Sequence, residues 1–224
     1  SPSAPSPTFE ANVAGTYRFN LSLTDASGGG AEAETFEVLV VPDTAIHVEL
    51  LWATPNDPDP TDNGPEAGTD LDLHFTHAFA SQPDLDGDGL PDPWFDPDWD
   101  CFWFSPTQDW GSSGSTTDDP RLDRDDTDGA GPENLNLEVP EDGTSYGIGV
   151  HYWGDHGFGS SFATLRVYVS STLVLEIDAI ELTNRDMWWA ASLDWPSGAV
   201  SPKLQEGGER WIHGPYEHAM FQGP

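Results

Sequence analysis

Basic residues are scarce in this sequence. Its 224 residues include only seven Lys and Arg but 40 Asp and Glu, which gives a formal net charge of −33. Proteins bind nucleic acids largely through basic side chains on the phosphates, so we expect no nucleic-acid partner. So much charge of one sign opposes compaction unless cations neutralise it. A highly solvated acidic surface is the alternative, although the acidic residues gather in particular segments instead of spreading along the chain.

Cysteine and long apolar runs are also missing. Cys101 is the single cysteine, so no disulfide can form within the chain. It is either a small buried apolar side chain or half of an intermolecular bridge. No stretch reaches the length of a transmembrane span, and no signal peptide is recognisable. We therefore expect no membrane span, and the mature form of a secreted or cell-surface protein would have this composition.

Common catalytic motifs do not occur either. The chain contains neither G-x-S-x-G nor H-E-x-x-H. Carboxylate pairs are abundant, which leaves a glycosidase open as an alternative. However, the aspartates recur in ligand-like repeats and not as two isolated residues. We predict a protein that is not an enzyme.

Helical periodicity is absent, and strand-like alternation takes its place. Short segments alternate apolar and polar side chains and are bounded by Gly, Pro, Asp or Ser. This pattern predicts an all-β fold, a calcium-loop β-sandwich or jelly roll preceded by an N-terminal hairpin. The predicted strands are 16–26, 34–42, 45–54, 70–79, 135–139, 145–153, 162–170, 173–182 and 187–195.

The predicted organisation has four parts. Residues 1–8, SPSAPSPT, form a Pro/Ser linker, and residues 9–42 hold the two strands of the hairpin. Residues 45–195 form the β-sandwich. Residues 196–224 are rich in Gly and Pro without a clear period, which predicts an irregular tail.

Acidic residues are concentrated in the stretch 56–142. It holds 24 of the 40 acidic residues but only two basic ones, Arg121 and Arg124. Aspartates recur there at spacings of one and two residues, interrupted by Gly and Pro. Oxygen ligands on tight turns are what Ca²⁺ requires, so we predict calcium as a cofactor, with more than one ion bound.

The segment DLDGDGLPD at 84–92 matches the opening of an EF-hand calcium loop. Such a loop places ligands at positions 1, 3, 5, 7 and 9, with Gly at position 6. Position 12 is Phe95 instead of the usual Glu, and the aspartates at 96, 98 and 100 can replace it. The phrase also resembles the calcium repeats of thrombospondin type 3 and dockerin modules. A solvated acidic turn is the alternative. The predicted ligands are Asp84, Asp86, Asp88, the carbonyl of Leu90, Asp92 and Asp96.

A second group of acidic residues combines a strand with a distant loop. Asp70 and Asp72 alternate along one predicted strand, so both project from the same face. So many carboxylates packed together without a cation would raise some of their pKa values strongly. The predicted ligands here are Asp70, Asp72, Asp123, Asp125, Asp126, Asp128 and Glu133.

Four phrases carry a resemblance to a known family. TDLDLHF, the WG at 110–111, DDTDGAGPENLNL and GTSYGIGVHYW look like the YfaP-type domain, an uncharacterised domain of secreted and periplasmic bacterial proteins. The resemblance spans about residues 45–195 and implies a β-sandwich, with no known reaction. The insertion carrying residues 84–100 departs from shorter versions of the pattern. The functional cluster that the resemblance implies is Asp70, Asp72, Asp126, Asp128 and Glu133.

The N-terminal hairpin resembles part of another module. The phrase GTYRFNLSLTD, within residues 9–42, is similar to the last strands of a PKD (polycystic kidney disease) repeat. The first half of such a repeat is missing. Two strands leave open edges and an open apolar face, so the next domain or another chain would have to complete them, unless the sequence is truncated.

These observations predict a non-enzymatic, secreted bacterial module with a structural or adhesive role. It could be the subunit of an extracellular filament or tube, a homo-oligomer in which strands are exchanged between subunits. The alternative is a carbohydrate-binding module of a larger secreted protein, with glycans as partners. Its candidate sugar-stacking residues lie near the acidic loops, where they could instead anchor those loops. They are Trp94, Trp99, Trp103, Trp110 and Trp153.

Overall fold

The computed structural model describes residues 6–30, 34–62, 64, 67–127 and 129–219. Every secondary-structure element in these residues is a β-strand, which confirms the all-β prediction. Within them there is no helix long and apolar enough to cross a membrane. The chain divides into two compact units, residues 1–43 and residues 44–224.

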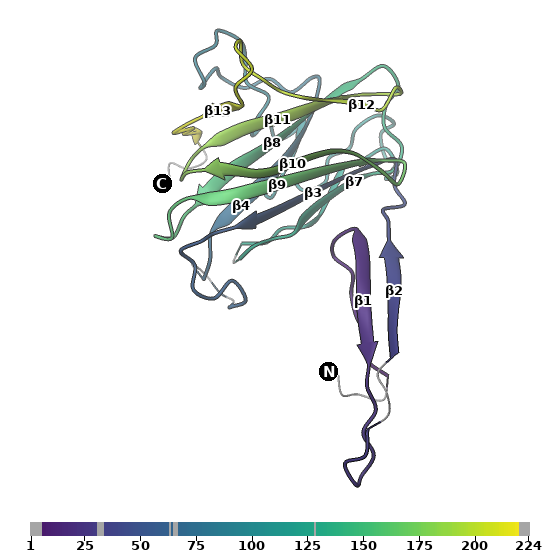
Figure 1. Ribbon diagram of the computed structural model, residues 1–224. Coiled ribbons are helices and arrows are strands. Elements are labelled where there is room, and N and C mark those ends of the chain that lie inside the picture. Colours follow the sequence, from purple (N-terminus) through teal and green to yellow (C-terminus); the bar gives the residue numbers. More distant parts are fainter. Residues whose placement is uncertain (1–5, 31–33, 63, 65–66, 128, 220–224) are drawn as a thin grey trace. The chain divides into compact units, whose positions relative to one another are not determined.

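The first unit is a hairpin. Its strands β1 (Gly15–Leu21) and β2 (Glu34–Val40) pair antiparallel (Figure 1). The pairing places Phe19 opposite Phe36 and Tyr17 opposite Val38, and Arg18 opposite Glu37. Because side chains alternate along a strand, the hairpin has one apolar face and one polar face.

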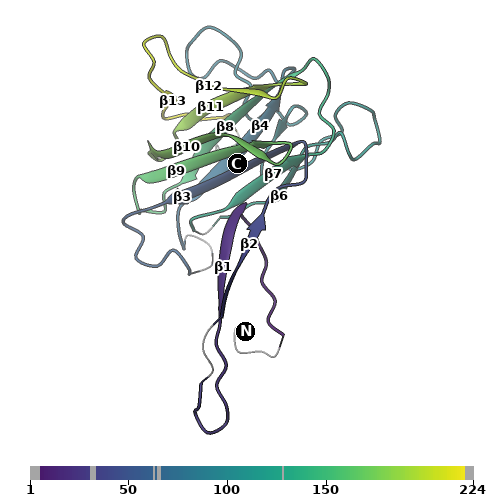
Figure 2. The ribbon, with the colours of Figure 1, turned by 45° about the vertical axis from the view of Figure 1, so that its right-hand side comes forward.

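The second unit is a sandwich of two antiparallel sheets, which appear as stacked layers in Figures 1 and 2. One sheet has the order β10-β9-β3-β7-β6. The other has the order β12-β11-β8-β4-β5, and β13 also pairs with β11. The strands of the first sheet are β3 (Ile46–Ala53), β6 (Arg121–Arg124), β7 (Glu133–Leu137), β9 (Ser161–Val169) and β10 (Thr172–Leu182). Those of the second are β4 (Asp70–His77), β5 (Asp100–Cys101), β8 (Ser145–Gly154), β11 (Met187–Asp194), β12 (Ala199–Pro202) and β13 (Trp211–His213).

The main core lies between the two sheets. It contains every second residue of β3 and β4, including Val48, Leu50, Leu71 and Leu73, all fully buried. The alternation seen in the sequence therefore sets which face of each strand turns inward. Cys101 is also fully buried and free, as its reading as a small apolar side chain predicts.

A second, smaller core covers the outer face of the six-stranded sheet. It joins the long acidic loop to the C-terminal segment through Trp94, Phe95, Phe102, Met187 and Tyr216. A side chain at position 149 of β8 would be 2.6 Å from the Trp94 ring, so glycine there allows the ring to lie on the sheet. Trp94 and Trp110 are only 3% exposed. These two tryptophans anchor the loop and offer no free face for stacking on a sugar.

The C-terminal segment departs from the prediction of an irregular tail. It forms β12 and β13, and both pair with β11. The ammonium of Lys203 lies 4.0 Å from the centre of the Trp189 ring. The Gly- and Pro-rich sequence has no strand periodicity, so its order depends on pairing with an existing strand and on these aromatic contacts.

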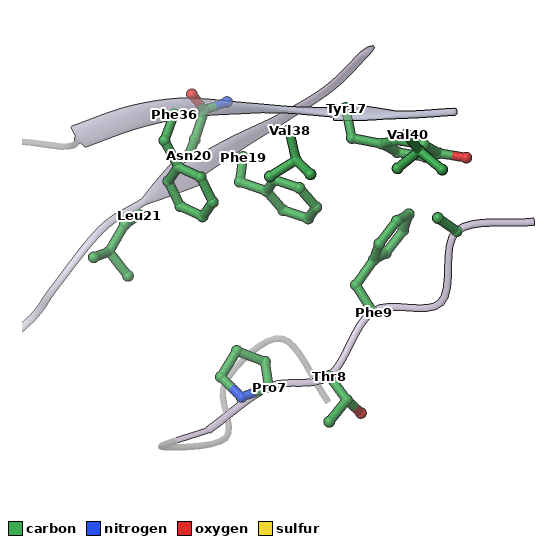
Figure 3. Close-up of a pocket in the computed structure, with 11 residues that line it drawn as sticks. Pro7, Thr8, Phe9, Tyr17, Phe19, Asn20, Leu21, Phe36, Val38 and Val40 are labelled. Atoms are coloured by element: carbon green, nitrogen blue, oxygen red, sulfur yellow. The ribbon is translucent and has the colours of Figure 1, made fainter. Parts of the chain in front are cut away.

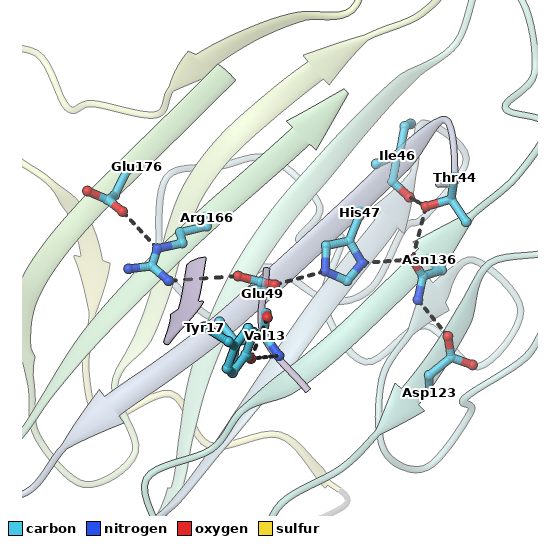
Figure 4. A network of polar contacts seen from close by, with 10 residues as sticks. All are labelled: Val13, Tyr17, Thr44, Ile46, His47, Glu49, Asp123, Asn136, Arg166 and Glu176. Atoms are coloured by element: carbon cyan, nitrogen blue, oxygen red, sulfur yellow. Dashed lines mark hydrogen bonds and ion pairs between the residues drawn. The ribbon is translucent and has the colours of Figure 1, made fainter. Parts of the chain in front are cut away.

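The outer face of the five-stranded sheet carries a chain of polar contacts across all five strands (Figure 4). Glu176 accepts a hydrogen bond from Arg166 at 2.7 Å, and Arg166 lies 3.9 Å from Glu49. His47 continues the chain, 3.2 Å from Glu49 and 2.7 Å from Asn136. Asn136 then donates to Asp123 at 2.5 Å. The carboxylates of this network each face a cation or a hydrogen-bond donor.

Candidate metal site

Three acidic side chains from distant parts of the sequence meet inside the sandwich unit. Asp70, Asp72 and Glu133 each offer a carboxylate oxygen, and these oxygens lie within 4.8 Å of one another. The three residues are 8%, 2% and 0% exposed. Three carboxylates this close and this deeply buried are the arrangement that a metal ion would stabilise.

The strand geometry brings them together. Leu71 and Leu73 point into the core, so Asp70 and Asp72 share the opposite face of β4. Glu133 begins β7 of the other sheet, and its Oε2 accepts a hydrogen bond from the Leu73 backbone N–H at 2.6 Å. The glutamate thus reaches across from one sheet to the edge of the other.

Gly131 allows the chain to approach closely just before Glu133. Its φ is +77°, a conformation that favours glycine. A Cβ there would lie 2.9 Å from both the Leu50 carbonyl oxygen and the Trp52 ring. The G-A-G-P-E-N phrase therefore combines a tight backbone approach with the carboxylate that follows it.

The electrostatics of the cluster favour a bound cation. Burial raises the pKa of Asp70 to about 7, with Asp125 adding repulsion. Burial also raises the pKa of Asp72 and that of Glu133 well above their usual values, and neighbouring carboxylates add to both shifts. The pKa of Asp125 is raised by burial too, although its hydrogen bond with Glu133 opposes the shift. In the metal-free chain these groups resist ionisation together.

Two oxygens of the cluster have no hydrogen-bond partner within the described part of the chain. They are Oδ1 of Asp70 and Oδ2 of Asp72, and both are buried. Nδ1 of His151 lies 3.9 Å from Oδ2 of Asp72, a distance that is too long for a hydrogen bond. The cluster is built of carboxylate oxygens. Ca²⁺ favours oxygen ligands of this kind, whereas softer transition metals favour nitrogen and sulfur ligands.

A second acidic group forms at the exposed loop 84–92. Oxygens of Asp84, Asp86 and Asp88 lie within 4.8 Å of one another, but these residues are exposed or half-buried. Their carboxylates accept hydrogen bonds from the loop's own backbone, for example from Gly87 and Gly89 to Asp84 at 2.6 and 2.9 Å. The three side chains spaced by two residues thus converge. Leu90 is exposed and its N–H donates to Asp88.

The C-terminal segment contacts this loop directly. Trp211 donates from its indole nitrogen to Oδ2 of Asp86 at 3.1 Å. Tyr216 donates from its hydroxyl to Oδ2 of Asp92 at 2.8 Å, and the Leu85 N–H donates to the same oxygen at 2.7 Å. A cavity of about 310 Å³ lies between loop and tail, lined in part by Asp88 and Glu206. Asp92 therefore holds the tail, and the oxygens that converge are those of Asp84, Asp86 and Asp88.

The remaining predicted ligands lie elsewhere or have other partners. Asp96 accepts hydrogen bonds from the backbone of Ser81, Asp98 and Trp99, as the cap of a turn. Asp123 pairs with Arg121 at 2.5 Å and belongs to the polar network across the five-stranded sheet. Asp126 pairs with Arg124 at 3.0 Å. Asp128 lies outside the described residues.

Two further polar contacts lie close to the site, and the sequence offers Asp100 only as a possible ligand of the 84–92 loop. Asp100 Oδ2 accepts hydrogen bonds from Nδ1 of His74 and from the Phe95 N–H, both at 2.6 Å, and both side chains of the His74–Asp100 pair are fully buried. Arg185, in the turn between β10 and β11, lies over the Trp153 ring at 5.1 Å, and its charge opposes part of the rise in the pKa values of Asp70 and Asp72. No spacing in the sequence links these residues, because the contacts join separate strands and a turn.

Comparisons with known proteins do not assign the chain to a family. No protein-family model and no curated protein matches the chain. The crystal structure of a protein of unknown function, SAV2460, is similar at 21% identity with a TM-score of 0.43, and the match covers 78% of this chain and 93% of that one. The resemblances to the YfaP-type domain and to a PKD repeat therefore stay predictions.

The raised pKa of Asp70 predicts a specific pH dependence in EDTA. The folded chain holds a proton on Asp70 that the unfolded chain releases, so this contribution to stability is present below about pH 4 and is lost as the pH rises through about 7. The variant Asp70→Asn cannot ionise there. We expect its unfolding free energy, relative to that of the unmodified chain, to rise over this window by up to about 4 kcal/mol.

Urea unfolding of the two chains at a series of pH values measures this difference and cancels the groups that lie away from the cluster. Parallel stability curves from pH 4 to pH 8 would show that Asp70 does not titrate in this way.

Proposed function

We propose that the protein is a calcium-binding module with a structural or adhesive role, without enzymatic activity. The observation that supports this best is the buried cluster of Asp70, Asp72 and Glu133, in which two carboxylate oxygens receive no hydrogen bond from the described residues. A Ca²⁺ ion would neutralise the cluster and tie the edge of β4 to the start of β7. The ion would thereby join the two sheets of the sandwich.

The exposed loop would supply a second, weaker site. Asp84, Asp86 and Asp88 converge there on carboxylates that the backbone N–H groups already satisfy in part. An ion at this loop would act on the C-terminal segment through the Trp211–Asp86 contact. Calcium would then govern both the stability of the sandwich and the order of the tail.

We further propose that the module acts outside the bacterial cell and self-associates in a filament or tube. The net charge of −33 supports a dependence on calcium, because subunits of this charge repel one another unless cations screen or bridge them. Strands at sheet edges would provide the exchange points.

Calorimetric titration with Ca²⁺, followed by light scattering and negative-stain microscopy, tests this proposal. We expect saturable binding, and ordered assemblies in Ca²⁺ that dissolve in EDTA. Absence of calcium binding would overturn the metal assignment. A monomer in both conditions would overturn self-assembly, and a tryptophan fluorescence response to glycans would then favour the carbohydrate-binding alternative.

A further inference from the structure

The hairpin unit has an apolar groove that none of its described residues fills. The groove has a volume of about 700 Å³ and lies between the arm at residues 7–11 and the face of β1 and β2 (Figure 3). Its walls include Phe9, Tyr17, Phe19, Phe36 and Val38. Figure 3 shows Phe9 on the arm pointing toward the side chains of the two strands, and its ring contacts Tyr17 and Phe19 edge-on at 4.9 and 5.2 Å.

On the opposite face of the hairpin, polar side chains of the two strands pair with one another. Arg18 donates to Glu37 at 2.6 and 3.0 Å, and Thr35 donates to Asn20 at 2.7 Å. Cross-strand polar pairs of this kind are typical of a face that stays in water. Within its described residues the hairpin is thus a single layer with one apolar face, and a single two-stranded layer is marginally stable in water without a second one.

The lining of the groove restricts the kind of partner. It contains no charged side chain, although the chain as a whole carries a charge of −33. A basic partner would bind to the carboxylates on other parts of the chain and not to this groove, which has none. An apolar surface is therefore the chemically matching partner, and every other copy of the chain presents one, which a two-fold axis can bring face to face.

The exposed apolar area is sufficient for a weak dimer. Phe9 and Phe36 are 59% and 53% exposed, and Leu21 and Val38 are 50% and 42% exposed. Because a buried aromatic side chain hides 150–250 Å², these four side chains together present roughly 300–500 Å² per chain. Two copies would bury roughly 600–1,000 Å² together, which is the size of a weak, transient interface.

We propose that the apolar face of the β1–β2 hairpin is a docking surface for the same face of a second copy. Two hairpins stacked in this way form a four-stranded, two-layer sandwich with Phe19, Phe36 and Val38 at its centre. The inference rests on the proposed self-association and adds a face-to-face contact to the exchange at strand edges, and it does not depend on either calcium site.

Sedimentation velocity of the full chain in EDTA, from micromolar to millimolar concentration, tests this inference. We expect a monomer–dimer equilibrium that strengthens as NaCl is added, because salt screens the repulsion between acidic chains but leaves apolar contacts. The variant Val38→Glu should lose the dimer. Its matched control is Leu39→Glu, which adds the same charge one residue away, on the opposite face, where Leu39 is 70% exposed, and it should keep the dimer.

A cross-linking measurement keeps the test decisive if Val38→Glu disrupts the hairpin itself. Under oxidation, Phe36→Cys should form a disulfide-linked dimer, and Leu39→Cys should not, because it lies on the opposite face. The native Cys101 is fully buried and should not contribute to cross-linking. A monomer at every concentration and salt level, or equal effects of the two glutamate variants, would overturn the inference. A monomer that still binds calcium would point to a different protein as the occupant of the groove and leave the metal site intact.

Discussion

Asp72→Asn is expected to reverse its effect on stability when calcium is added. In EDTA the variant should be as stable as the unmodified chain or more stable, because it removes one of three crowded, buried carboxylates. In saturating Ca²⁺ it should be less stable by about 4 kcal/mol, the gain expected for a ligand at a thousand times its Kd. For a chain of this size the loss corresponds to a fall in Tm of about 10 °C.

Thermal unfolding of both chains, with and without calcium, measures this change in the sign of the stability difference. The matched control is Asp123→Asn, an isosteric change at an acidic residue that pairs with Arg121 away from the cluster. It should show no dependence on calcium beyond that of the unmodified chain. If Asp72→Asn were equally destabilising in EDTA and in calcium, its carboxylate would be a structural hydrogen-bonding group and not a ligand.

Asp100→Ala is expected to produce the second large effect, a loss of about 3–5 kcal/mol with or without calcium. The substitution leaves two buried donors without their acceptor, Nδ1 of His74 and the Phe95 N–H. Because Phe95 belongs to the smaller core that holds the acidic loop, the damage should spread to that loop. Urea unfolding gives the free energy, and the near-ultraviolet signal of the buried tryptophans reports the loop.

Asp98→Ala is the control for this prediction. Asp98 is exposed two residues away, and its contact with the Trp110 indole uses the backbone carbonyl, which the substitution keeps. We expect a change below about 0.5 kcal/mol. A similarly small loss for Asp100→Ala would show that the His74–Asp100 pair contributes little to stability.

Most of the strands could be predicted from the sequence, for a simple physical reason. Strands such as β3, β4 and β9 turn every second side chain into the main core, and that apolar alternation is visible in the chain itself. The strands that were missed, β5, β6, β12 and β13, are short and lack such a period. They form because a neighbouring strand edge is available to them, and that information is not local.

For the candidate site, the sequence determined the chemistry and the tertiary structure decided the membership. The alternation of Asp70 and Asp72 with Leu71 and Leu73 places two carboxylates on one face, and the Asp84–Asp88 spacing makes three carboxylates converge. Both follow from backbone geometry alone. Acidic composition could not separate Glu133, which meets the pair, from Asp123, which meets Arg121 instead. That distinction depends on how the two sheets stack, and stacking is set by the whole core and not by any one segment.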